Sequence, residues 1–83
     1  SFAHMKNIQT LILDKNNFKE IPGEIFKLKT LKELSLRENQ LTSLPEEISK
    51  IKGLELLDLT GNKIPISDVD ILKALLPYCK IIN

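Results

Sequence analysis

The sequence has few of the residues on which most enzyme and metal sites depend. One cysteine, Cys79, leaves neither an intramolecular disulfide framework nor a cysteine-based zinc site. The single histidine, His4, falls in residues 1–4, which look like a remnant of cloning ahead of Met5 and are left out of the fold prediction. With no other histidine to serve as a base, we expect no enzyme, no catalytic residue, no cofactor and no metal ligand.

The sequence also lacks a glycine-rich phosphate-binding motif, long apolar runs and a large excess of charge of one sign. Gly23, Gly53 and Gly61 are isolated, so no glycine-rich nucleotide loop is predicted. The apolar runs are far shorter than the ~20 residues that cross a bilayer, and we expect no membrane insertion. Twelve basic and eleven acidic side chains give a formal charge of +1, which does not favour nucleic acid. The compartment stays open: secreted or surface-associated if a signal peptide was removed, otherwise cytoplasmic.

The chain is organised around LKELSLREN, residues 31–39, because this stretch is repeated on both sides. The alternation of Leu34 and Leu36 is typical of a half-buried strand, and Asn39 ends the run. The same pattern recurs at one constant spacing, before this stretch as ILDKNNF and after it as LDLTGNKI, each with an asparagine in the same phase. We therefore predict a single domain, residues 5–83, made of two full repeats and a capping repeat: residues 8–30, 31–53 and 54–83.

The shared pattern, LxxLxLxxNxLxxLPxxI over residues 8–64, resembles the leucine-rich repeat. Together with the ending LLPYCKII, the stretch NQLTSLPEEI is similar to the bacterial 23-residue leucine-rich repeat proteins, particularly the families abundant in Leptospira. This resemblance implies an α/β fold, a short right-handed solenoid. It also implies a parallel sheet on the concave face, short helical turns on the convex face, and protein recognition as the usual task.

The residues themselves predict where the elements lie. Three short parallel strands are expected around residues 11–13, 34–36 and 57–59. Proline followed by acidic residues, at Pro22 and at Pro45, is typical of the start of a helical turn.

The third repeat departs from the pattern after Ile64, and we expect a capping helix from about residue 68 to residue 76. Ser67 and Asp70 resemble a capping box at its start. Leu75 and Leu76 belong to the apolar positions that recur at helical spacing.

Buried polar and sulfur groups are expected at fixed repeat positions. Asn16, Asn39 and Asn62 should turn inward and satisfy backbone groups of neighbouring turns. Cys79, flanked by apolar residues and without a partner histidine, is expected to be a buried structural residue, and Tyr78 to help cover the open end of the core.

The register predicts the candidate binding site. Outward strand positions that lie one repeat apart form three rows across the sheet. Arg37 supplies a planar donor group of the kind enriched in interfaces, whereas the alternative is that it only neutralises Asp14 and Asp58. The predicted partner-binding residues are Thr10, Ile12, Asp14, Glu33, Ser35, Arg37, Leu56, Asp58 and Thr60.

Two functions are compatible with this pattern. The first is a module that binds a protein ligand through the concave strand face, with a host or surface protein as one candidate. The alternative is a structural or adaptor protein that self-associates through its exposed first strand, as a weak homo-oligomer instead of a monomer. The sequence does not identify the partner.

Overall fold

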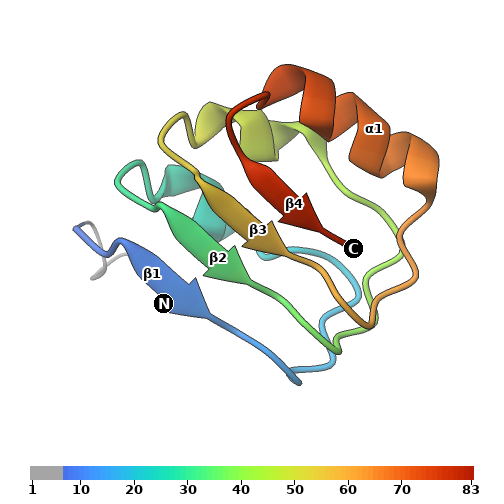
Figure 1. Cartoon of the computed structure of the whole chain (residues 1–83). Helices are drawn as coiled ribbons and strands as arrows, with labels where there is room; N and C mark the ends of the chain where they lie inside the picture. Colours follow the sequence, from blue (N-terminus) through green and yellow to red (C-terminus); the bar gives the residue numbers. More distant parts are fainter. Residues whose placement is uncertain (1–6) are drawn as a thin grey trace.

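The computed structural model describes residues 7–83, and the expectation for residues 1–4 lies outside them. Within residues 7–83, four short strands form one sheet, with the helical segments packed behind it (Figure 1). The elements in chain order are β1 (Thr10–Ile12), the 3₁₀ helix η2 (Gly23–Lys27), β2 (Glu33–Ser35), the 3₁₀ helix η3 (Glu46–Lys50), β3 (Leu56–Asp58), α1 (Ile66–Leu75) and β4 (Lys80–Ile82).

The sheet is parallel throughout, in the order β1-β2-β3-β4. Its register pairs Leu11 with Leu34, Leu34 with Leu57, and Leu57 with Ile81. The predicted solenoid with a parallel sheet and helical turns is therefore confirmed. The strands begin one residue earlier than predicted, and β4 was not predicted as a strand.

The core lies between the sheet and the helical segments. Leu34 and Leu57 contribute one inward side chain from each of the central strands, and Ile25 and Ile48 contribute one from each 3₁₀ helix; all four are fully or almost fully buried. Both 3₁₀ helices follow a proline and carry acidic residues in the first turn and a lysine in the last, as the sequence predicts. Side chains alternate between the two sides of each strand, and a proline starts each helical turn. The inward side chains of the strands and turns therefore form one apolar layer.

Asn39 and Asn62 form the predicted inward ladder. The side-chain amide of Asn39 donates to the carbonyl oxygens of Leu13 and Leu36 at 3.1 and 3.0 Å, and its Oδ1 accepts the backbone amides of Asn16 and Phe18 at 2.8 and 3.1 Å. Asn39 thus joins its own loop to the loop of the preceding repeat.

Asn62 repeats this arrangement one turn later. It donates to the carbonyl oxygens of Leu36 and Leu59 and accepts the amide of Leu41. Asn16 differs: its side chain is exposed and donates only to the nearby Asp14 carbonyl oxygen at 3.2 Å. The prediction of an inward Asn16 is wrong, because no earlier loop lies beside it within residues 7–83.

The residue that follows each of the first three strands by three positions has a left-handed backbone. Lys15, Glu38 and Gly61 occupy equivalent repeat positions, with φ of 59°, 55° and 81°. The amides of Lys15 and Glu38 donate to the carbonyl oxygens of Arg37 and Thr60, which continues the ladder beyond the strands. The sharp turn after each of these three strands is therefore part of the repeat, and lysine, glutamate and glycine occupy it in turn.

The capping helix was predicted in the right region, but its start is different. It begins at Ile66 behind Pro65, and no side chain caps it, so the predicted Ser67–Asp70 capping box is absent. Asp68 instead accepts the backbone amide of Leu44 at 3.1 Å, which ties the helix to the preceding repeat. Leu72 and Leu76 are buried, whereas Leu75 is 45% exposed and lies outside the core.

Cys79 is buried, as predicted, and its position explains why. Its amide donates to the Leu76 carbonyl oxygen, as those of Leu31 and Leu54 donate to residues three positions earlier. Cys79 therefore takes the buried place that leucine takes in the full repeats. Tyr78 precedes it in the turn and is 95% exposed, so the expectation that Tyr78 covers the core is wrong.

Candidate protein-binding face

The outward side of the sheet, which we call the strand face, carries the nine residues predicted to bind a partner. The register pairs Thr10 with Glu33 and then Leu56, and Ile12 with Ser35 and then Asp58, so two of the predicted rows lie as expected. Asp14, Arg37 and Thr60 follow the strands at equivalent positions of their repeats.

The strand face contains a shallow hollow of about 220 Å³. Eight of the nine predicted residues line it, and Thr60 does not. The two rows within the strands and the first two residues of the third row therefore share one concave surface.

Asp14 organises the start of the third row through hydrogen bonds. Its Oδ1 accepts the hydroxyl of Ser35 at 2.6 Å and the backbone amide of Arg37 at 2.8 Å. The predicted ion pair between Asp14 and the Arg37 guanidinium is not among the contacts of the described residues. Asp14 instead connects the first repeat to the second, and this fixes the path of the Arg37 backbone.

Arg37 does interact with the other predicted carboxylate. Its Nε lies 3.8 Å from Oδ2 of Asp58, a long contact for an ion pair, and the arginine side chain remains 49% exposed. Oδ1 of Asp58 accepts the hydroxyl and the amide of Thr60 at 2.7 and 3.1 Å. Because this ion pair is long and solvated, it contributes little to folding and leaves the guanidinium accessible to a ligand.

The charge state of Asp58 follows from these neighbours. Burial raises the pKa of the Asp58 carboxyl, but the hydrogen bonds from Thr60 and the charge of Arg37 together lower it by more. The net pKa therefore lies below its ordinary value, and Asp58 is ionised at neutral pH. The strand face presents a carboxylate and a guanidinium side by side at its centre.

Apolar side chains lie on the same face, on β1 and on β3. Ile12 on β1 is 66% exposed, and Leu56 on β3 is half-buried. The register adds Ile82 beside Asp58 and Lys80 beside Leu56, so β4 extends both rows by one residue.

Lys80 and Ile82 are the residues of this face that the sequence reasoning missed. Their offset from their β3 partners is one position longer than the repeat, and the LxxLxL pattern is absent around them. The available signal was the pair of β-branched residues Ile81 and Ile82, too short to indicate a strand by itself.

Other kinds of site have little support in residues 7–83. This part of the chain holds no group of three or more histidine, cysteine or acidic side chains placed to bind a metal ion. Burial raises the pKa of the Cys79 thiol, which makes it less reactive. In the same range, no helix has the length and apolar character required to span a membrane.

Comparison with known proteins decides the family. The family model described as "Leucine rich repeat" matches residues 6–64, most of the chain. The chain belongs to the leucine-rich repeat family. Ten chains of solved structures match this leucine-rich repeat chain, whereas no curated protein does. Members of the family are typically non-enzymatic and mediate protein–protein interactions.

One of the similar solved structures is a leucine-rich repeat protein of Leptospira interrogans. It is 42% identical, has a TM-score of 0.84, and the alignment covers 93% of this chain. The resemblance to Leptospira leucine-rich repeat proteins is thereby confirmed. The alignment covers 20% of the Leptospira protein, so this chain spans about a fifth of that protein's length.

Proposed function

We propose that this leucine-rich repeat chain is a non-enzymatic module that binds a protein ligand through the strand face. The observation that carries the proposal is that Ile12, which is 66% exposed, and the accessible guanidinium of Arg37 line the same concave hollow. Exposed apolar and arginine side chains in one hollow are typical of interface centres.

The contacts behind the hollow support the same function. Asp14 and Asp58 hold their neighbours through hydrogen bonds across repeats and within the turn after β3. These bonds position the face before a ligand arrives, so that fewer groups need to be ordered on binding. A host or surface protein is our candidate class of ligand.

A peptide display library selected against the immobilised chain provides a defined ligand for the test. We expect the affinity of the selected peptide to fall at least tenfold for Ile12→Asp and for Arg37→Glu, because each change places a repelling or desolvated charge at the interface centre. Lys27→Glu, on the convex side, is the matched control and should bind as the wild type does. Circular dichroism establishes that each variant is folded.

The proposal fails if both folded strand-face variants retain the wild-type affinity. A peptide whose binding is lost only with Lys27→Glu would move the interface to the convex side.

The second candidate function is self-association through β1, and one observation favours it. Ile8, Leu13 and Phe18 are only partly buried, whereas the equivalent side chains of the second repeat, Leu31, Leu36 and Leu41, are fully buried. Within residues 7–83, no strand pairs with the outer edge of β1. An open edge beside partly exposed apolar side chains invites a second chain.

Sedimentation over a range of concentrations tests this second candidate. Leu13 donates to β2 through its amide, so the alternating Thr10 and Ile12 amides face the open edge. Thr10→Pro therefore removes an edge donor and should abolish any dimer. A strict monomer at high concentration would exclude self-association and leave the strand-face proposal untouched.

A further inference from the structure

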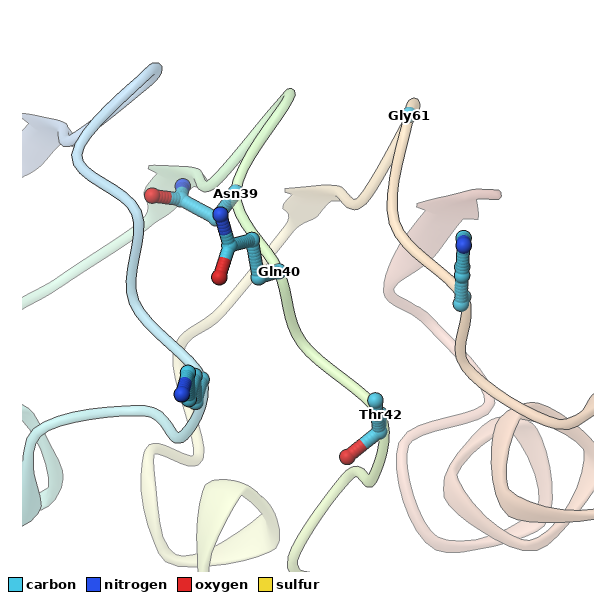
Figure 2. A pocket seen from close by; sticks show the side chains of 6 residues that line it. Asn39, Gln40, Thr42 and Gly61 are labelled. Atoms are coloured by element: carbon cyan, nitrogen blue, oxygen red, sulfur yellow. The ribbon is translucent and has the colours of Figure 1, made fainter.

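A second groove lies away from the strand face, on the loops that follow the strands. This loop groove has a volume of about 430 Å³ and is lined by Lys19, Asn39, Gln40, Thr42, Gly61 and Lys63. Figure 2 shows Gln40 and Thr42 along the loop of the second repeat and Gly61 on the loop of the third. Lys19 belongs to the first repeat, so the groove crosses three repeats and shares no residue with the strand-face hollow.

The repeat places the charged and neutral groups of the groove in order. The second repeat contributes the uncharged Gln40 and Thr42, whereas the outer repeats contribute Lys19 and Lys63. Neighbouring strands are ~4.8 Å apart, so equivalent positions two repeats apart lie on the order of 10 Å apart. Lys19 corresponds to Thr42 and Lys63 to Gln40, so the two lysines are offset from equivalent positions by two residues along the chain.

Backbone hydrogen bonds hold these loops at a fixed spacing. The amide of Gln40 donates to the Phe18 carbonyl oxygen at 2.8 Å, and that of Lys63 donates to the Leu41 carbonyl oxygen at 3.0 Å.

The loop groove carries positive charge that the chain does not neutralise. No carboxylate lines it, and within residues 7–83 neither Lys19 nor Lys63 forms an ion pair. Glu38, whose side chain lies close to Gly61, is 3.9 Å from the Lys15 ammonium, and Glu20, which follows Lys19, is not among the residues that line the groove. The two lysines are therefore available to an anionic ligand.

We propose that the loop groove binds an extended acidic segment of a protein partner. Acidic side chains two residues apart in an extended chain are ~6.6 Å apart on one face, a separation that two flexible lysine side chains can match. Gln40 and Thr42, which both donate and accept hydrogen bonds, meet the peptide backbone between the two charges. A groove with lysines from its two outer repeats and neutral donors and acceptors between them fits a peptide better than a single compact anion.

The test uses a fluorescein-labelled hexapeptide of alternating glutamate and serine, with a glutamine-for-glutamate peptide as the neutral control. Fluorescence anisotropy should show saturable binding of the acidic peptide only. The double variant Lys19→Glu with Lys63→Glu should weaken it at least tenfold. Lys29→Glu with Lys50→Glu makes the same change in net charge on exposed convex lysines and should leave the affinity within twofold. Arg37→Glu tests independence from the strand face and should also bind normally.

Several results would overturn the proposal. Absence of saturable binding, equal binding of the neutral peptide, or equal loss in both lysine double variants would each show that the loop groove is not a specific site. Complete displacement of the peptide by inorganic phosphate at constant ionic strength would show a simple anion site. If the charge-reversed variant does not fold, Lys19→Gln with Lys63→Gln is measured instead, and unchanged affinity would contradict the proposal.

Discussion

At the scale of single residues, the same position in the repeat has different consequences in different repeats. Asn39 is buried and bridges two loops, whereas Asn16, in the same phase, is exposed and bonds locally. Sequence periodicity predicts equivalent roles, but the role depends on whether a preceding loop is present to receive the amide. The periodicity therefore predicted Asn39 and Asn62 correctly and Asn16 wrongly.

We predict that Asn39→Ala lowers the free energy of unfolding by about 1–3 kcal/mol, because it leaves backbone groups of two loops without partners. Asn16→Ala is the matched control, and its exposed side chain should contribute less than about 0.5 kcal/mol. Urea melts of both variants provide the measurement. Equal stability of Asn39→Ala and the wild type would refute the inward ladder.

Gly61 carries the second residue-scale prediction. Its φ is +81°, and a Cβ placed there would lie 3.0–3.3 Å from side-chain and backbone atoms of Glu38. Gly61→Ala should therefore destabilise the chain by about 1–3 kcal/mol through backbone strain and crowding.

Gly53 is the control for that prediction, since its nearest neighbour is the Leu31 carbonyl oxygen at 3.9 Å. Gly53→Ala should be neutral or stabilise by about 0.4–1 kcal/mol, because it restricts the unfolded chain. Thermal melts that rank the two variants in the opposite order would contradict this account of the turn.

At the scale of elements, the strands of the repeats could be predicted and the final strand could not. Leu11, Leu34 and Leu57 are evenly spaced, one repeat apart, and this periodicity indicates both their inward orientation and their register. The third repeat loses that period: Cys79 replaces leucine, and the offset between β3 and β4 is one position longer than that between the earlier strands. When a strand forms mainly because it pairs with a neighbouring strand, its own sequence gives only a weak strand signal.

The α1 start was missed for a related reason. Ser67 and Asp70 match a local capping pattern, but Asp68 bonds to a backbone amide in another repeat, and Pro65 precedes the helix. The start therefore follows the proline signal already seen before both 3₁₀ helices, and Asp68 is used in a tertiary contact instead of a cap. The strand-face rows could be predicted because they follow from strand register alone, while the loop groove could not, because side chains from three repeats form it.

The stability of the sheet should depend strongly on its inward positions. Leu36→Ala removes a fully buried side chain, and we expect a loss of about 2–5 kcal/mol from the transfer and cavity contributions. This loss should equal or exceed that of Asn39→Ala. Ile12→Ala, on the exposed side of the sheet, should change stability by less than about 0.5 kcal/mol. Comparable urea midpoints for these two variants would show that the core has been assigned to the wrong side.

At the scale of the whole molecule, one small core supports two separate surfaces, the strand face and the loop groove. A chain of 83 residues buries only ~60% of the surface of its unfolded form, so its stability margin is small. The hydrogen bonds of Asn39, Asn62 and Asp14 link the repeats and keep both the strand face and the loop groove in shape. A substitution can therefore change binding without changing stability only at exposed positions such as Ile12 and Arg37.

The most direct test of the central claim is a chemical-shift map of the isotopically labelled chain with its selected peptide ligand. Binding through the strand face predicts that the largest amide shifts fall in residues 10–14, 33–37 and 56–60 (β1 to β3 in Figure 1). Shifts confined to the 3₁₀ helices η2 and η3, with none across the sheet, would contradict the claim.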